Sequence, residues 1–269
     1  MAINLNKKYF IAIIAIVIML SVVLLGLLHK KTPSDWDEIS KEGRITVAIE
    51  RSFFGLTNDS NGIAGFQYEL IKAFADSMQL ELVIVEESNL QKAVDKLLDG
   101  ECDIVASFVP LGAFKDTTQI AYSTAFQRSK LMLVQKLATG KQLIRKQYDL
   151  ADDSIYVAQG SRYVRRLQNL SNEIAADIHI FEVKNKSNDE MIALVANGEY
   201  SKSVLLENRV KHFATLYPAL DFSLALSLDQ EQVWMVRKSS PLLLEKLNAF
   251  YAEYIHTLAY LELYAKYYN

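Results

Sequence analysis

Two short segments of the chain carry charged or polar residues at positions where α/β proteins commonly bind small ions. Glu50 and Arg51 end a β-rich segment, and open α/β sheets place their ligands at the carboxyl ends of their strands. Gly160, Ser161 and Arg162 form a turn that leads into a predicted helix. The amino terminus of a helix presents unpaired N–H groups and a partial positive charge, which suits an anion such as a carboxylate. These residues predict recognition of a small charged solute.

Patterns typical of catalysis or metal binding are missing from this sequence. The histidines share no metal-like spacing, and we find no Ser/His/Asp order, no Gly-rich phosphate loop and no persuasive pair of carboxylates. Cys102 is the only cysteine, which rules out an intramolecular disulfide and disfavours a zinc site. We therefore predict no cofactor and no metal, and we expect Cys102 to be a small buried residue at the start of a strand.

The overall composition is that of a globular protein without affinity for nucleic acid. The chain has 269 residues, which is enough for one large domain or two modest lobes. Hydrophobic residues make up 51% and charged residues 23%, a balance that favours a packed core over disorder. The net charge of −3 gives no reason to expect a nucleic-acid partner.

The amino-terminal segment from Tyr9 to Leu28 predicts a membrane span. It contains no charged residue, its only clearly polar side chain is Ser21, and its length matches the ~20 residues that cross a bilayer as a helix. A cleaved signal peptide has a shorter apolar region of ~7–15 residues and a small-x-small site, which Leu24–Leu28 does not provide. We expect an uncleaved signal anchor, with residues 1–8 in the cytoplasm and 29–35 as a linker. A signal peptide cleaved at an atypical site is the alternative.

The rest of the chain alternates between predicted strands and helices, which indicates an α/β fold with largely parallel sheets. The predicted strands cover residues 44–50, 80–85, 103–108, 131–135, 154–159, 178–183, 203–206 and 232–237. The predicted helices cover residues 35–41, 66–78, 90–98, 163–170, 189–196, 242–255 and 258–267.

Several motifs in this order resemble bacterial extracellular solute-binding proteins of family 3. Gly65–Leu70 (Gly-Phe-Gln-Tyr-Glu-Leu) resembles the family's Gly-Phe-Asp-x-Asp-Leu helix start, and Gly100–Ala106 resembles its Gly-x-x-Asp strand. Ile120–Ser123 resembles its Phe-Ser strand entry, and Gln159–Ser161 its Gly-Ser/Thr helix turn. The resemblance implies a type 2 periplasmic binding fold, in which two α/β lobes are joined by two hinge crossings.

A narrower likeness is to the non-catalytic sensor half of the membrane-bound lytic transglycosylase F family. It is carried by four segments: Asn197–Tyr200, Leu206–Asn208, Tyr217–Asp221 and Val233–Pro241. In that family a lysozyme-like catalytic domain follows the sensor half, whereas this chain ends at Asn269. We therefore expect no glycan cleavage and no enzymatic activity.

The resemblance also implies domain boundaries and a location. Lobe 1 is expected to comprise residues 36–128 and 230–269, and lobe 2 residues 129–229, after the single transmembrane helix. The chain is then a single-pass protein of the cell inner membrane, with its carboxyl-terminal domain in the periplasm. Lysines flank the span on both sides, so the distribution of positive charge does not determine its orientation. The orientation is inferred from the resemblance.

In relatives that bind amino acids, two charged groups hold the ligand, and this chain departs from both patterns. An arginine after the third strand grips the carboxylate with two hydrogen bonds, but the corresponding loop here offers only Lys115. An acidic residue of the second lobe binds the amino group, but Leu206 stands at that position. Glu207 is adjacent, although neighbouring side chains of a strand point to opposite faces. We predict that free α-amino acids do not bind tightly.

Further residues complete the predicted cleft. Phe53, Phe54 and Tyr68 could wall it from the first lobe, with core packing as the alternative for Phe54 and Tyr68, and Ser107 ends the third strand. The predicted ligand site is therefore Glu50, Arg51, Phe53, Tyr68, Ser107, Lys115, Gly160, Ser161, Arg162 and Glu207.

Two functions remain open at this point. The first is an anchored sensor that binds a small solute or a peptide-like ligand, such as a cell-wall fragment. The second is a non-catalytic regulator or scaffold of a peptidoglycan lytic enzyme that has lost ligand binding. The predicted protein partner is accordingly a cell-wall enzyme or a membrane transporter.

Overall fold

The computed structural model describes residue 17 and residues 35–59, 62–114, 117–137 and 142–268. The predicted membrane anchor therefore lies outside the described residues except for Val17, and so does Lys115. Within the described part of the chain, no helix combines the length and the apolar character needed to cross a membrane.

Lobe 1 is built on a mixed six-stranded sheet in the order β4-β1-β5-β13-β6, with β7 also paired to β13. Strands β4, β1 and β5 are parallel, whereas β13 runs antiparallel to β5, β6 and β7. The strands are β1 (Arg44–Ile49), β4 (Glu81–Glu86), β5 (Ile104–Pro110), β6 (Ile120–Tyr122), β7 (Gln127–Ser129) and β13 (Gln230–Arg237).

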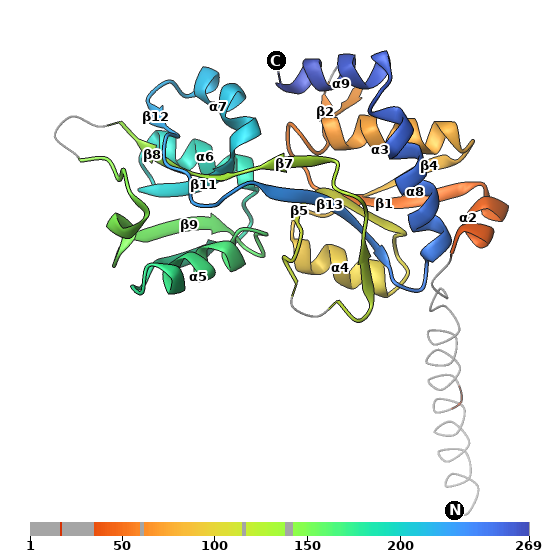
Figure 1. The fold of residues 1–269 in the computed structure, drawn as a ribbon, viewed down its shortest axis with the longest axis horizontal. Helices are drawn as coiled ribbons and strands as arrows, with labels where there is room; N and C mark the ends of the chain where they lie inside the picture. Colours follow the sequence, from red (N-terminus) through yellow and green to blue (C-terminus); the bar gives the residue numbers. More distant parts are fainter. Residues whose placement is uncertain (1–16, 18–34, 60–61, 115–116, 138–141, 269) are drawn as a thin grey trace, which may run out of the picture.

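The side chains of β1 alternate between two hydrophobic clusters, one on each face of this sheet. Ile45, Val47 and Ile49 pack with helices α3 and α8, whereas Ala48 packs with α4. This alternation follows from the two-residue period of a strand, and it explains why helices cover both faces (Figure 1). The helices of lobe 1 are α2 (Trp36–Glu42), α3 (Phe66–Ser77), α4 (Leu90–Leu98), α8 (Pro241–Tyr254) and α9 (Leu258–Tyr268). A short hairpin, β2 (Thr57–Asp59) and β3 (Gly62–Ala64), precedes α3.

Lobe 2 contains two small sheets. In the first, β8 lies between β11 and β12 and is antiparallel to both; in the second, β9 and β10 are parallel, and β9 lies against β11. The strands are β8 (Leu131–Lys136), β9 (Ser154–Ala158), β10 (His179–Val183), β11 (Lys202–Leu206) and β12 (Leu220–Asp221). The helices are α5 (Val164–Glu173), α6 (Asn188–Asn197) and α7 (Val210–Leu216), with 3-10 turns η1 (Gln147–Leu150) and η2 (Glu207–Arg209).

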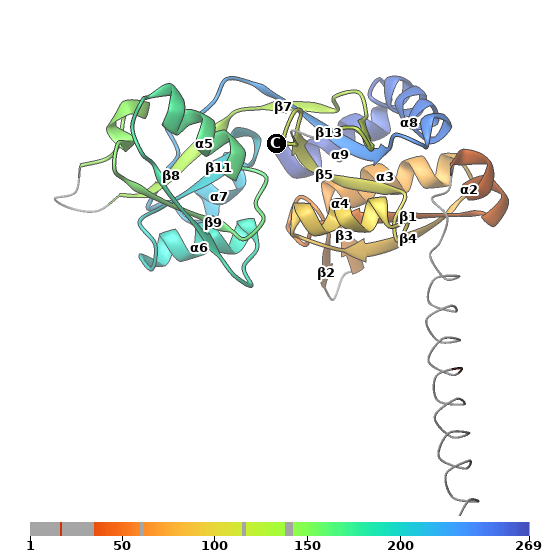
Figure 2. The ribbon, with the colours of Figure 1, turned by 90° about the horizontal axis from the view of Figure 1, so that it is seen from below.

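The chain crosses between the lobes twice. It leaves lobe 1 between β7 and β8 and returns ahead of β13, and both connections are visible in Figures 1 and 2. The returning strand β13 enters the lobe 1 sheet from the end where β5 leaves it, so the two pair antiparallel. The sheets are therefore mixed, and the expectation of largely parallel sheets was wrong, whereas two α/β lobes are present as predicted.

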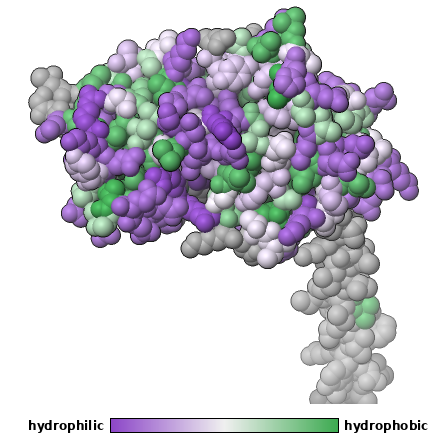
Figure 3. Space-filling view, viewed as in Figure 1, coloured by the Kyte–Doolittle hydropathy of each residue, from purple (hydrophilic) through white to green (hydrophobic). Residues whose placement is uncertain are grey.

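The face of the molecule in Figure 3 mixes hydrophilic side chains with small scattered apolar groups and has no broad apolar patch. Polar groups on this face gather around the region where the two lobes meet.

Candidate functional site

Four charged side chains meet between the two lobes, and we call them the interlobe charge cluster: Glu50, Arg162, Asp189 and Arg209. Glu50 follows β1 of lobe 1, whereas the other three belong to lobe 2: Arg162 is in the turn before α5, Asp189 in the first turn of α6 and Arg209 at the end of η2. Arg209 is 0% exposed, Glu50 2% and Arg162 5%, so these three side chains are almost free of solvent, whereas Asp189 is partly exposed.

Glu50 is the centre of this cluster. The Nη2 of Arg209 lies 2.9 Å from its Oε1, and the Nη2 of Arg162 donates to its Oε2. The Nη1 of Arg162 also donates to the backbone oxygen of Phe108 in lobe 1, at 2.7 Å. The Nη1 of Arg209 lies 3.5 Å from Oδ1 of Asp189. The two arginines of the cluster, Arg162 and Arg209, are thus both bound to the same carboxylate of lobe 1.

The guanidinium of Arg209 also contacts two buried aromatic rings of lobe 1. Its carbon lies 4.4 Å from the ring centre of Phe108 and 5.1 Å from that of Phe54. Both rings are fully buried. A desolvated guanidinium over aromatic rings is stabilised by the ring quadrupole, by ~2 kcal/mol or more. Arg209 therefore lies in an environment with both a carboxylate and aromatic faces.

The cluster is electrically neutral, because two guanidinium groups face two carboxylates. The pKa of Arg162 is lowered to about 10, chiefly by burial and also by the positive charge of Arg209, while Tyr163 and Asp189 oppose the change. At neutral pH this guanidinium therefore remains protonated. A buried cluster that is neutral by itself needs no ion from solution to balance it.

The two lobes also touch around the cluster, so the cleft is closed. The backbone N–H of Leu90 donates to the oxygen of Gly160 at 3.3 Å, and a Cβ on Gly160 would lie only 2.2 Å from Nδ2 of Asn89. On another side, the ring of Phe53 stacks on His212 with 3.9 Å between ring centres. These contacts join lobe 1 to lobe 2 directly.

At the turn before α5, where an anion site was predicted, the backbone N–H groups of Gly160 and Ser161 already have hydrogen-bond partners within the protein. The N–H of Gly160 donates to Glu182 at 2.7 Å, and that of Ser161 donates to Ala158 at 3.0 Å. The hydroxyl of Ser161 is 3.1 Å from Oδ1 of Asn188. The expectation of free N–H groups at this turn was therefore wrong, because side chains and backbone of the same lobe occupy them.

Other predicted site residues are dispersed. Ser107 is buried within β5, Tyr68 packs half-buried against the lobe 1 core, and Phe53 is at the edge of the interface. Glu207 is exposed on η2, 3.7 Å from Nζ of Lys130, and so is not part of the buried cluster. Glu207 follows the last residue of β11. The alternation of side chains along a strand, from which its direction was predicted, therefore does not apply to it.

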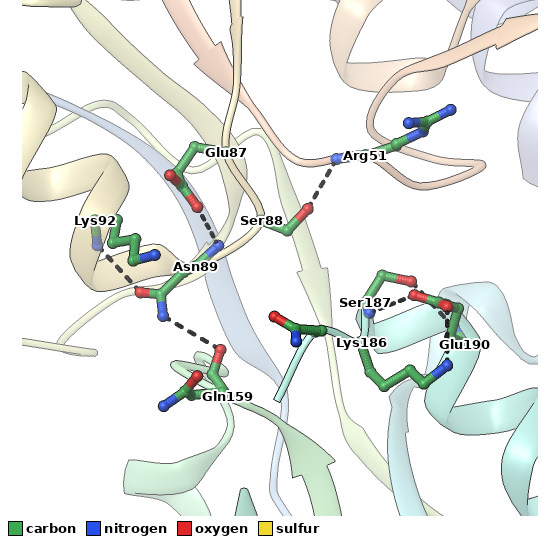
Figure 4. A pocket seen from close by; sticks show the side chains of 10 residues that line it. Arg51, Glu87, Ser88, Asn89, Lys92, Gln159, Lys186, Ser187 and Glu190 are labelled. Atoms are coloured by element: carbon green, nitrogen blue, oxygen red, sulfur yellow. Dashed lines mark hydrogen bonds and ion pairs between the residues drawn. The ribbon is translucent and has the colours of Figure 1, made fainter. Parts of the chain in front are cut away.

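An open pocket of about 470 Å³ lies at the mouth of the cleft (Figure 4). We call it the mouth pocket, and Arg51 is the only predicted site residue among those that line it. Both lobes contribute polar and charged side chains. The lining residues are Arg51, Glu87, Ser88, Asn89 and Lys92 of lobe 1 and Gln159, Asn185, Lys186, Ser187 and Glu190 of lobe 2.

Sequence reasoning missed two members of the cluster, Asp189 and Arg209, and one of their aromatic neighbours, Phe108. Arg209 comes three residues after the end of the apolar strand β11, and this position at a strand's carboxyl end was the available signal. Asp189 is in the first turn of a predicted helix, where an acidic residue is common on a solvated surface. Among the described residues, no group of His, Cys, Asp and Glu could hold a metal ion.

Two lobes, two crossings and a site enclosed between them define a protein of the two-lobed binding class. Residues 45–269 match the family described as bacterial extracellular solute-binding proteins, family 3, and the chain belongs to this family, as the sequence motifs predicted.

Curated relatives of the chain carry the name membrane-bound lytic murein transglycosylase F. The protein of that name from Alcanivorax borkumensis is 28% identical over 229 residues, which are 85% of this chain and 48% of the relative. The one from Shewanella woodyi is 28% identical over 208 residues, 75% of this chain and 42% of the relative. The chain thus spans about half the length of the curated relatives it matches.

Solved structures share the fold. A mutant of ArgBP from T. maritima superposes with a TM-score of 0.71 at 22% identity, covering 86% of this chain and 97% of that one. An ancestral arginine-binding protein bound to arginine gives 0.71 at 19% identity, covering 84% of this chain and 99% of that one. Identities this low establish the architecture and not the ligand.

Proposed function

We propose that this chain is a non-catalytic sensor module of the solute-binding fold, anchored in the cell inner membrane with its lobes in the periplasm. Its ligand is a polar, peptide-like molecule bound at the mouth pocket, and free α-amino acids are not its ligands. The observation that carries the proposal is the interlobe charge cluster, which fills the centre of the cleft with the protein's own charges.

Among the residues that the structure describes, a free amino acid would find no unpaired charged partner in this centre. Its carboxylate needs a cation and its amino group an anion, but Arg162 and Arg209 already share Glu50. Each charge-assisted hydrogen bond contributes ~1.5–3 kcal/mol. A zwitterion that displaced the cluster would therefore have to break several such bonds to form its own, with little net gain.

The mouth pocket offers better chemistry for a ligand. Its volume is within the range of ~300–1,000 Å³ that is common for small-molecule sites. Cationic side chains of Arg51 and Lys92 and the carboxylates of Glu87 and Glu190 line it together with amide groups. Carboxylates and peptide groups of a short peptide match this lining, and the names of the curated relatives support a ligand from the cell wall.

A second candidate function is that of a regulator or scaffold for a separate peptidoglycan lytic enzyme. One observation favours it: the lobes are held together by their own residues. In this case the mouth pocket would bind no solute, and the protein's surface would bind the enzyme.

Calorimetric titration of the purified periplasmic part tests the proposal. We expect no binding of any of the standard amino acids and measurable binding of a murein stem peptide. The double variant Arg51→Glu with Lys92→Glu should abolish peptide binding, whereas Glu207→Gln, an exposed charge outside the mouth pocket, should not change it. Micromolar binding of a free amino acid would overturn the assigned ligand class. Co-purification of a lytic enzyme without peptide binding would favour the second candidate.

A further inference from the structure

We propose that Glu50, Phe54 and Phe108 form a guanidinium-binding site of lobe 1, and that Arg209 of lobe 2 is its built-in ligand. We call these three residues the guanidinium site. The inference deepens the proposed function, because it identifies what occupies the centre of the cleft in place of a solute.

All three residues of the guanidinium site come from the same edge of the lobe 1 sheet. Glu50 follows β1, Phe54 is in the loop after it, and Phe108 lies near the end of the neighbouring parallel strand β5. Carboxyl ends of parallel strands meet at one edge, where this fold class places ligands. Lobe 1 therefore forms the three-residue site with its own residues. Lobe 2 supplies the cation, together with Asp189 beside it and Arg162 on the second oxygen of Glu50.

The chemistry of the site selects a guanidinium over an ammonium ion. Its carboxylate accepts a hydrogen bond of 2.9 Å from Nη2, and its two aromatic rings contact the guanidinium at 4.4 and 5.1 Å. A guanidinium is planar, weakly hydrated and able to stack on aromatic rings, whereas an ammonium is a compact and strongly hydrated charge. The complete burial of Phe54 and Phe108 strengthens this preference, because the cation must give up its water.

Recognition of Arg209 is concentrated at the end of its side chain. Its terminal nitrogens bind Glu50 and Asp189, whereas the buried Nε has no hydrogen-bond partner among the described residues. A freely diffusing alkylguanidinium carries the same terminal group. The site should therefore accept such a molecule once the side chain of Arg209 is removed.

Because Arg209 belongs to the same chain, it competes at a high effective concentration. Tethered groups commonly reach the millimolar range, so a free guanidinium compound cannot displace Arg209 unless it exceeds that concentration by a wide margin. The wild-type protein should therefore not bind added guanidinium compounds, and its two lobes should be closed without any solute.

The test is rescue of the variant Arg209→Ala by methylguanidinium chloride. Thermal unfolding is followed with increasing methylguanidinium up to about 20 mM, far below the molar concentrations at which guanidinium salts unfold proteins. We expect the Tm of the variant to rise by about 3 °C or more. The Tm of the wild type should not change, and methylammonium chloride should have no effect on either protein.

Two further variants make the rescue specific. Arg165→Ala removes another arginine that reaches across the interface, to the backbone oxygen of Gly112, but is not bound by the guanidinium site, and it should not be rescued. The double variant Arg209→Ala with Glu50→Gln should lose the rescue, because the carboxylate is gone. A folded Arg209→Ala that responds equally to methylammonium, or to neither salt, overturns the inference.

If Arg209→Ala does not fold, it is refolded with and without methylguanidinium, and Arg209→Gln is tested in parallel. Folding that depends on methylguanidinium supports the inference, and no response from either variant overturns it. These outcomes are separate from the titrations of the wild type. Amino-acid binding by the wild type together with rescue of Arg209→Ala would overturn the proposed function and leave the guanidinium site in place.

Discussion

Glu50 and Arg209 are 159 positions apart in the chain, yet the Nη2 of Arg209 lies 2.9 Å from a carboxylate oxygen of Glu50. Glu50 belongs to lobe 1 and Arg209 to lobe 2, and both are buried. This ion pair therefore exists only when the lobes are together. The closed form of the protein is held by its own residues, and its predicted responses to mutation follow from that.

Replacement of Glu50 by Gln should both destabilise and open the protein. The variant leaves two buried guanidinium groups without their shared carboxylate, and breaking a buried ion pair in this way costs ~3–5 kcal/mol of unfolding free energy. Urea unfolding measures the loss, and small-angle scattering should show a larger radius of gyration. The control is Asp103→Asn, which breaks the buried pair with Arg237 inside lobe 1 and should destabilise without opening. An unchanged radius for Glu50→Gln would contradict the role in closure.

Replacement of Gly160 by Ala should push the lobes apart. Gly160 has a φ of +70°, and an added Cβ would lie 2.2 Å from Nδ2 of Asn89, whose side chain is fixed as the N-cap of α4. Gly198 is the matched control, because it has a φ of +83° but its added Cβ would meet only Lys136 at 3.6 Å. Both Ala variants should lose ~1 kcal/mol of stability from the left-handed backbone. Only Gly160→Ala should enlarge the scattering radius, and equal radii would refute the close approach.

Stability should fall below about pH 6.5 in a way that depends on His212. In the folded protein burial lowers the pKa of His212 from 6.5; Asp189 opposes this change and Arg209 adds to it. The unfolded chain then binds the proton more tightly. The contribution of neutral His212 is complete above its unfolded pKa and is lost as the pH falls toward the folded one. His212→Gln should flatten the dependence of the unfolding free energy on pH between 7.5 and about 5. His256→Gln, at an exposed histidine, should leave it unchanged.

The thiol of Cys102 should be unreactive until the protein unfolds. Its pKa is raised to about 12, chiefly by burial and also by the charge of Asp103, while Arg237 partly opposes the change. At pH 8 the thiolate fraction is then on the order of 10³-fold below that of an ordinary cysteine. Reaction with a thiol reagent should be slower by at least that factor in the native state and should become fast in denaturant. Rapid labelling of the native protein would contradict the burial of Cys102.

The helices and strands were largely predictable because apolar residues recur in the sequence at the spacing that each kind of element requires. The helix expected over residues 66–78 is observed at Phe66–Ser77, and the helix over residues 90–98 coincides with α4. Helix α7 was missed because it continues directly from η2 and has no side-chain cap at its start. The hairpin of β2 and β3 has strands of three residues, too short for an alternating pattern to be recognised.

The site was only partly predictable. Glu50 and Arg162 were chosen because each stands beside the end of a regular element, and the structure brings them together. Arg209 was not chosen, because arginines are usually exposed and nothing in the local sequence marks one that is fully buried. Burial of a charge depends on partners, and here the partners are in the other lobe.

The sequence by itself determined two α/β lobes and the family to which the chain belongs, because these depend on local patterns and motif order. Only the tertiary structure decided what fills the cleft. The charges of Glu50, Arg162, Asp189 and Arg209 come from separate segments and neutralise one another only when the lobes close. Whether two charges interact depends on their distance in space, and the spacing of residues along the chain does not give that distance.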